Sequence, residues 1–202
     1  MKPRKAKRRK AEEYVDYAVL VTAWHSIWPE HAAGFKGRLH AGVTIGRNGR
    51  LDIARWAFDN GVDPGSVIDI GLVPNALLPP ILREMDVALQ PSRAEACTNL
   101  PVKEAMACGV PVIAAFNTGM KDLLDDSNSI VLRAQRAVSQ PAGTSSDDWG
   151  ESDVDEIVAA LEFAYQRRDE SRAIGMRARG WLIDHDRTWQ AHATALKSWL
   201  AS

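Results

Sequence analysis

Five short apolar runs are spaced along this chain, and helical patterns or turn signals separate them. They span residues 17–22, 66–70, 87–90, 110–115 and 129–132. Apolar runs of about four to eight residues are typical of strands that are buried on both faces of a sheet. Parallel strands need crossover connections, and helical segments lie between the runs to supply them. The pattern therefore predicts an α/β fold with a doubly wound, Rossmann-like parallel sheet.

Helical patterns fill the segments between these runs and most of the chain after them. The predicted helices span residues 51–60, 78–85, 100–108, 120–124, 153–167, 170–183 and 188–200. In the segment 153–167, Val154, Ile157, Val158 and Leu161 follow the i, i+3, i+4, i+7 spacing of a helix packed on one face. The last three segments predict extra C-terminal helices. Residues 139–152 are rich in Ser, Asp and Gly, which predicts an exposed loop.

The predicted helix 100–108 has a clear beginning and end. Thr98 and Asn99 are capping candidates, Pro101 lies in the first turn, and Gly109 follows the last turn. The backbone N–H groups at a helix start are unpaired and carry partial positive charge. The turn 97–100 is therefore a candidate binding site for a phosphate or another anion.

Two carboxylates flank this helix start. Glu95 comes just before it, and Glu104 lies about one turn into the helix, with its side chain leaning back toward the N-terminus. Carboxylates accept hydrogen bonds from sugar hydroxyls and repel phosphates. A ligand with its charge on the helix start and its hydroxyls on the two glutamates fits this arrangement. The alternative is that both glutamates are ordinary solvated side chains.

The motif around these residues resembles that of a known family. The segments are PSRAE at residues 91–95 and NLPVKEAMACGVPVI at residues 99–113. They are similar to the donor-binding half of family-4 glycosyltransferases of the GT-B fold, and the similarity extends over about residues 60–202. The spacing differs from the usual one, because eight residues, 96–103, separate Glu95 from Glu104. The glycine-rich turn of the family is also replaced, by Ala96-Cys97-Thr98-Asn99, which narrows the room for close backbone approach to a ligand.

The resemblance implies roles for individual residues. Glu95 would orient the donor sugar as the catalytic residue, and Glu104 would hold the nucleotide ribose. An arginine would offset the diphosphate charge, with Arg38, Arg93 and the stretch 47–50 as open candidates. The remaining donor-binding candidates are Thr98, Asn99 and Leu100 at the helix start and Asn117, Thr118 and Gly119 after the next strand. Retention of anomeric configuration is expected. The nucleotide-sugar is a substrate, and no cofactor is expected.

Length bounds the domain organisation. The 202 residues suffice for one domain, whereas GT-B enzymes place their active site between two. We expect a basic disordered arm at 1–13 and a donor-binding domain at 14–202, including C-terminal helices at 153–202. The N-terminal acceptor domain of GT-B is expected to be absent. An acceptor-domain protein or self-association would then supply the other half.

Charge is concentrated in the N-terminal arm. The stretch from Lys2 to Lys10 holds seven of the 25 basic residues, so 18 basic residues face 26 acidic ones in the remainder. Such an arm suits anionic lipid head groups or nucleic acid. Nothing in the body shows a basic groove with interleaved aromatic residues, which argues against nucleic acid as the main partner. No apolar run approaches the roughly 20 residues that a membrane helix needs, and the N-terminus lacks the apolar core of a signal peptide. We expect a cytoplasmic protein that can lie at the membrane periphery.

Metal and thiol chemistry receive little support. Asp153 with Asp155, and Asp184 with Asp186, have the spacing that other glycosyltransferase folds use for a divalent ion. The first pair lies at a helix start and the second at a turn between helices, so we assign both pairs a structural role and expect no metal. The two cysteines of the chain cannot build a disulfide framework.

Two functional hypotheses remain. The first is a nucleotide-sugar-dependent glycosyltransferase, or its donor-binding half. The second is a non-catalytic binding or scaffolding module that kept the donor-domain fold, with the basic arm contacting anionic lipid or nucleic acid. The altered turn at Ala96-Cys97 favours the second, and the glutamate pair favours the first.

Overall fold

A computed structural model describes residues 19–21, 70, 73–95, 97–138 and 148–201. The chain divides into two compact units, one of residues 1–22 with 76–202 and the other of residues 23–75. Only residues 70 and 73–75 of the second unit are described. The predicted arm 1–13, the predicted helix 51–60 and most of the predicted strand 66–70 lie outside the described residues.

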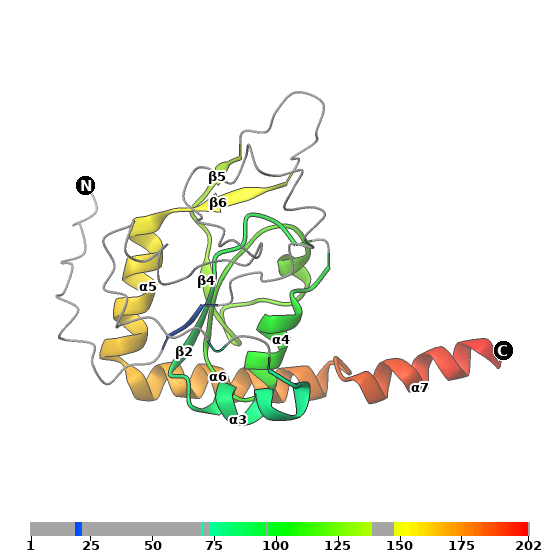
Figure 1. The fold of residues 1–202 in the computed structure, drawn as a ribbon. Coiled ribbons are helices and arrows are strands. Elements are labelled where there is room, and N and C mark those ends of the chain that lie inside the picture. The colour runs from blue at the N-terminus through cyan, green and yellow to red at the C-terminus, as the bar shows by residue number, and fades with distance from the viewer. Residues whose placement is uncertain (1–18, 22–69, 71–72, 96, 139–147, 202) are drawn as a thin grey trace, which may run out of the picture. The chain divides into compact units, whose positions relative to one another are not determined.

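Four parallel strands form the sheet of the first unit (Figure 1). In spatial order they are β1 (Val19–Val21), β2 (Val87–Gln90), β3 (Val112–Ala115) and β4 (Ile130–Leu132). The register pairs Ala88 with Val112, and Ile113 with Ile130. All four lie within predicted runs. β3 begins two residues later than predicted, since Pro111 has no N–H to donate to a strand ladder.

Helices cover both faces of the sheet. On β3, Val112 and Ala114 belong to a core cluster with α4 (Leu100–Ala107) and α6 (Arg168–Asp184). Ile113 points to the other face, where its cluster includes Ala160 and Ala164 of α5 (Val154–Gln166). Figure 1 shows α4 and α5 on opposite sides of the strands. This alternation is that of a doubly wound sheet, so the predicted α/β fold class is confirmed.

A glycine sets the close packing of α6 on the end of α4. A Cβ atom added at Gly175 would lie 2.3 Å from the carbonyl oxygen of Gly109 and 2.7 Å from the nitrogen of Pro111. Gly109 itself ends α4 with a φ of 76°, a conformation that favours glycine. The two glycines together let the backbones of α4 and α6 meet.

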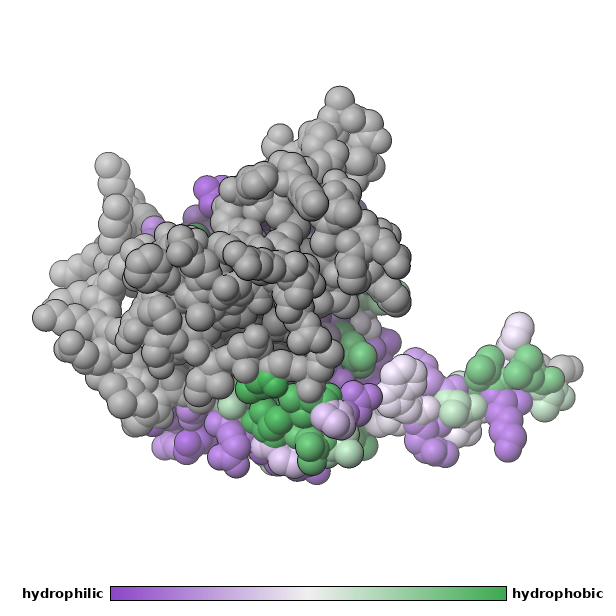
Figure 2. Space-filling model, viewed as in Figure 1, coloured by the Kyte–Doolittle hydropathy of each residue, from purple (hydrophilic) through white to green (hydrophobic). Residues whose placement is uncertain are grey.

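The other helices agree with the predictions to within a few residues. They are α3 (Leu78–Arg83), which follows the short 3₁₀ helix η4 (Asn75–Leu77), and α7 (Trp189–Leu200). The short helix predicted near residues 120–124 is a 3₁₀ helix, η5 (Thr118–Asp122). Figure 2 shows hydrophobic residues toward the C-terminal end of α7, and none of the residues of this helix is buried. Within the described part of the chain, no helix has the length and apolar character needed to cross a membrane.

The prediction of an exposed loop at residues 139–152 is wrong for the C-terminal end of that segment. Residues 150–152 form β6 (Gly150–Ser152), which pairs antiparallel with β5 (Gln135–Ala137), and both Gly150 and Ser152 are buried. These strands are too short and too polar to show an alternating pattern. Their pairing depends on tertiary contacts, including a bond of 2.9 Å from Gln135 Nε2 to Ser152 Oγ. Residues 139–147 lie outside the described residues.

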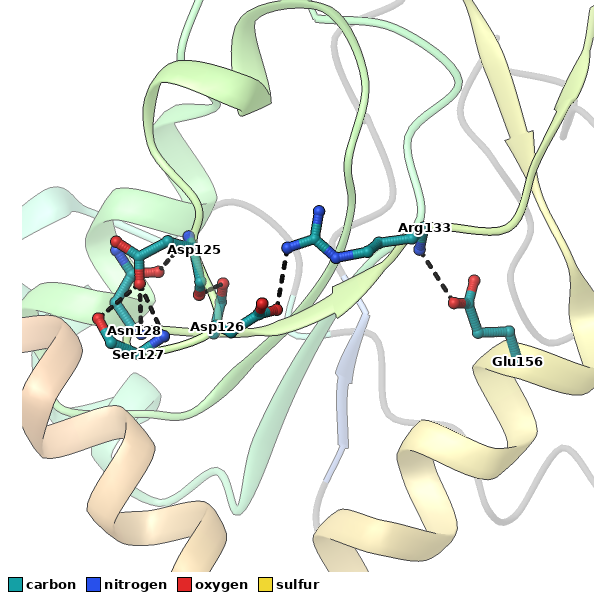
Figure 3. Close-up of polar contacts among 7 residues, drawn as sticks. Asp125, Asp126, Ser127, Asn128, Arg133 and Glu156 are labelled. Atoms are coloured by element: carbon teal, nitrogen blue, oxygen red, sulfur yellow. Dashed lines mark hydrogen bonds and ion pairs between the residues drawn. The ribbon is translucent and has the colours of Figure 1, made fainter.

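The turn between η5 and β4 is held by side chains (Figure 3). The carboxylate of Asp125 accepts hydrogen bonds from the backbone N–H and the hydroxyl of Ser127, at 2.7 and 2.5 Å, and from the N–H of Asn128 at 3.1 Å. In turn, the side-chain oxygen Oδ1 of Asn128 accepts a hydrogen bond from the N–H of Asp125 at 2.9 Å. Beside it, Arg133 contacts Asp126 at 3.0 Å and donates its backbone N–H to Glu156 at 3.0 Å. These bonds tie β4 to the start of α5.

Candidate active site

The candidate site lies at the carboxyl ends of β2 and β3. In doubly wound sheets ligands bind at this edge, in the crevice that forms where the loops of neighbouring strands lead to helices on opposite faces. The loop 91–99 follows β2 and leads into α4, and residues 116–119 follow β3. All described residues of the predicted site except Leu100 and Glu104, which lie in α4, belong to these two segments.

Glu95 is held at three points. Its backbone N–H donates to the hydroxyl of Thr118 at 2.7 Å, and its carbonyl accepts from the N–H of Gly119 at 3.3 Å. Its carboxylate oxygen Oε1 accepts a hydrogen bond of 2.5 Å from the side-chain amide of Asn99. Both the backbone and the carboxylate of Glu95 are therefore oriented by neighbouring segments.

Asn99 caps α4, as its sequence position predicted. Its Oδ1 accepts from the N–H of Val102 at 3.1 Å, and its carbonyl accepts from Lys103 at 3.2 Å. Pro101 has no N–H, and among the described residues nothing accepts from the amide of Leu100, the first residue of α4. The helix start therefore offers an anion its dipole and the Leu100 amide, and fewer donors than an uncapped helix end.

The turn at Thr118 and Gly119 is a tight contact with the loop before α4. Thr118 has a φ of 37°, which is unusual for a β-branched residue and costs about 1–3 kcal/mol. A Cβ atom added at Gly119 would lie 2.5 Å from the carbonyl oxygen of Cys97. Only glycine lets the two backbones approach this closely. Backbone strain of this kind is concentrated at functional sites.

Asn117 is a buried hub, not a surface group. It is 2% exposed, and its Nδ2 lies 2.8 Å from the carbonyl oxygen of Ser92, 3.2 Å from Oε1 of Gln135 and 3.2 Å from the carbonyl oxygen of Gly150. Its Oδ1 accepts from the hydroxyl of Thr118 at 3.1 Å. The hub links the loops after β2 and β3 to the β5–β6 ribbon. Gln135 and Gly150 were not predicted, because a polar residue beside a loop gives no signal of a long-range contact.

Arg93 pairs with the ribbon. Its guanidinium lies 2.7 Å from Oε1 of Glu151, and its carbonyl accepts from the N–H of Gly150 at 2.9 Å. The hydrogen bond and the charge of Arg93 lower the pKa of Glu151 below its ordinary value. Both side chains are exposed, so the pair contributes little to stability. Arg93 thus has a carboxylate partner in addition to its predicted role toward a diphosphate.

Glu104 is half-buried on α4, and burial raises its pKa above the ordinary value of 4.5. In the described part of the structure its carboxylate makes no hydrogen bond or ion pair. A half-buried carboxylate without a protein partner is a candidate ligand group, because a bound donor such as a hydroxyl would satisfy it.

The structure brings some predicted residues together and leaves others apart. Glu95 and Asn99 are in direct contact, as are Thr118 and Gly119 with Glu95. Thr98 is half-buried next to Asn99, and Arg38 lies outside the described residues. Asp153 caps α5 by accepting from the N–H groups of Asp155 at 2.9 Å and Glu156 at 3.2 Å, as the structural interpretation predicted.

Comparison with known protein families identifies the family of this chain. The family described as "Glycosyl transferases group 1" matches residues 11–142. The chain therefore belongs to the group 1 glycosyltransferase family. No curated protein matches the chain.

Two solved complexes of one protein show the same fold, and a third structure is similar at a lower score. Anabaena HepE in complex with UDP superposes with a TM-score of 0.52 at 19% identity, over 90% of this chain and 41% of HepE. HepE in complex with UDP-glucose gives 0.50 at 17% identity, over 81% of this chain and 35% of HepE. The C-terminal domain of LpcC, a group 1 family protein from Francisella tularensis, gives 0.45 at 20% identity, over 66% of this chain and 60% of that one. The chain thus spans well under half the length of HepE, and the fold corresponds to one half of a GT-B architecture.

Proposed function

We propose that this chain is the donor-binding half of a glycosyltransferase that transfers a sugar from a nucleotide-sugar to an acceptor. The observation that carries the proposal is the immobilised carboxylate of Glu95 at the carboxyl end of the sheet, in a chain of the group 1 family. A carboxylate fixed before substrate arrives costs little to organise and can select one orientation of a sugar hydroxyl.

Five of the predicted residues have a direct role in this proposal. Glu95 orients the donor sugar, and the carboxylate of Glu104, which has no partner among the described residues, accepts hydrogen bonds from the ribose hydroxyls. The diphosphate lies at the start of α4, against the Leu100 amide and the positive end of the helix dipole. Arg93 or Arg38 supplies a positive charge for the leaving diphosphate. Transfer proceeds with retention and without a metal ion, and the nucleotide-sugar is consumed as a substrate.

A titration of nucleotides and nucleotide-sugars tests this function. HepE has been solved with UDP and UDP-glucose, so these are the first probes, followed by the GDP and ADP equivalents. Calorimetry of the wild type and Glu104→Gln should show binding that weakens in the variant. Glu84→Gln, an exposed glutamate beyond the end of α3, is the matched control and should bind as the wild type does. Failure of every nucleotide to bind would contradict the proposal.

The second candidate is a non-catalytic module that kept the fold. The small number of free backbone N–H groups at the start of α4, among the described residues, favours this candidate. With few N–H groups to bind the diphosphate, the domain would bind a nucleotide-sugar weakly. Hydrolysis of a bound nucleotide-sugar, or transfer to an added acceptor, distinguishes the two. An acceptor-domain partner and self-association stay predictions of the first candidate. A cytoplasmic location and membrane contact through Lys2 to Lys10 stay predictions that either candidate allows.

A further inference from the structure

We infer that Asn99 is a positioning residue, which acts on the donor sugar through Glu95 and does not itself touch the ligand. The inference rests on the proposed function, because it explains how Glu95, the residue that orients the donor sugar in that function, is held in place. It revises the predicted role of Asn99 as a direct donor contact.

The geometry of the Asn99 side chain carries this inference. Nδ2 donates to Oε1 of Glu95 at 2.5 Å, while Oδ1 accepts from the N–H of Val102 at 3.1 Å. The two ends of one planar amide are thus fixed, one by the helix start and the other by the carboxylate. Because the amide is rigid, the direction of the first turn of α4 sets the direction of the Glu95 carboxylate.

Burial of the Asn99 side chain argues against a direct contact between Asn99 and the ligand. Asn99 is 4% exposed, and both polar atoms of its side chain already have protein partners. Because the side chain is almost fully buried, little of the amide is accessible to a ligand. Glu95 is half-buried, and its second carboxylate oxygen has no hydrogen bond among the described residues, so this oxygen remains available to a sugar hydroxyl.

The backbone of Glu95 is fixed independently of Asn99. Thr118 accepts from its N–H, and Gly119 donates to its carbonyl. Loss of the Asn99 bond would therefore leave the Glu95 backbone in place and free only the side chain to rotate. The expected defect is specific to the sugar and leaves the nucleotide contacts intact.

The variant Asn99→Ser separates positioning from capping. Serine caps helices about as well as asparagine, and it adds no charge beside the diphosphate seat. Its hydroxyl is too short to bridge to Glu95 while it caps the helix. We expect the folded protein to lose only the stability of this one hydrogen bond and the affinity for UDP to stay within about twofold. The affinity for UDP-glucose should fall by up to about tenfold, because the freed Glu95 side chain must then be ordered when the sugar binds.

A double-mutant cycle with Glu95→Ala shows whether Asn99 acts through Glu95, because alanine keeps no oxygen that could accept from Asn99. If Asn99 does act through Glu95, the double variant loses no more UDP-glucose affinity than Glu95→Ala alone. Additive losses, or equal losses for UDP and UDP-glucose in Asn99→Ser, would overturn the positioning role. If the wild type binds UDP-glucose and Asn99→Ser binds it equally well, the inference alone fails. If the wild type binds neither ligand nor their GDP and ADP equivalents, the proposed function fails and the positioning role falls with it.

Discussion

The side-chain amide of Asn117 lies 2.8 Å from the carbonyl oxygen of Ser92, although these residues follow different strands. The same amide nitrogen contacts the carbonyl oxygen of Gly150 in the β5–β6 ribbon, at 3.2 Å. The loop that carries Glu95 is thus joined to two other segments by one buried side chain. The position of Glu95 depends on residues that are distant in the sequence.

Replacing Asn117 by alanine should destabilise the domain by about 1–3 kcal/mol, because the carbonyl oxygens of Ser92 and Gly150 would lose their buried donor. Urea denaturation monitored by circular dichroism measures the change. Gln190→Ala, at an exposed position on α7, is the control and should alter the free energy of unfolding by less than about 0.5 kcal/mol. Equal stability of the Asn117 variant and the wild type would show that the hub is dispensable.

Two glycines of α6 should respond in opposite ways to alanine. Gly175→Ala places a Cβ 2.3 Å from the carbonyl oxygen of Gly109, so α4 and α6 must separate, at a cost of about 1–3 kcal/mol or more. Gly180 has no atom within 4 Å of an added Cβ, and alanine there should stabilise the helix by about 0.5–1 kcal/mol. Thermal unfolding of both variants should therefore shift the midpoint down for Gly175→Ala and up for Gly180→Ala. A shift in the same direction would contradict the observed packing of α6 on α4.

Gly119→Ala should weaken ligand binding more than stability. The added Cβ would lie 2.5 Å from the carbonyl oxygen of Cys97, so the turn after β3 must move away from the loop that carries Glu95. The expected result is about a tenfold or greater loss of UDP-glucose affinity, measured by calorimetry. Cys97→Ser is the matched control, since the contact is with the backbone of residue 97 and this side chain is exposed. Wild-type affinity in Gly119→Ala would show that the turn does not shape the site.

The Asp125 carboxylate should stabilise the fold most at neutral pH. Burial acts to raise its pKa, but the bonds from Ser127 and Asn128 outweigh it, so the pKa lies below the ordinary value of 3.8 (Figure 3). A lowered folded-state pKa means that the stabilisation is present above the unfolded-state pKa and is lost as the pH falls through the folded-state value. Asp125→Asn should therefore be less stable than the wild type at pH 7, and the difference should shrink below pH 3.8. Urea denaturation at pH 7 and pH 3 tests this, and a difference that does not depend on pH would contradict it.

The contribution of Glu104 to stability should depend on pH in the opposite direction. Burial raises its pKa above 4.5, so the folded state favours the protonated form and the stabilisation disappears as the pH rises through the raised value. Glu104→Gln should gain stability relative to the wild type between pH 4 and pH 7, since glutamine has no charge to desolvate. Unfolding at these two pH values measures the gain. Saturating UDP-glucose should reverse the order at pH 7, because only the wild type keeps the carboxylate that binds ribose in our proposal.

The hydrophobic pattern alone predicted most regular elements of the described structure. β2 and α4 occur where the apolar run at 87–90 and the helix signals from Asn99 to Gly109 place them. The Asn99 cap and the helix-start role of Asp153 were also predicted correctly. These features depend on residues that are at most a few positions apart, so local periodicity and capping preferences suffice to reveal them.

Tertiary structure alone decided the partners of the site residues. Arg93 meets Glu151 and Asn117 meets Gly150 across 58 and 33 positions of the sequence, and no spacing rule joins such residues. The β5–β6 ribbon was missed for the same reason, because its short polar strands are held by side chains from other loops. The sequence by itself determined the class of sheet, the helices around it and the candidate carboxylates. The fold then decided which carboxylate is immobilised and which has no partner among the described residues, since hydrogen bonds between distant loops form only after the sheet has brought the ends of its strands together.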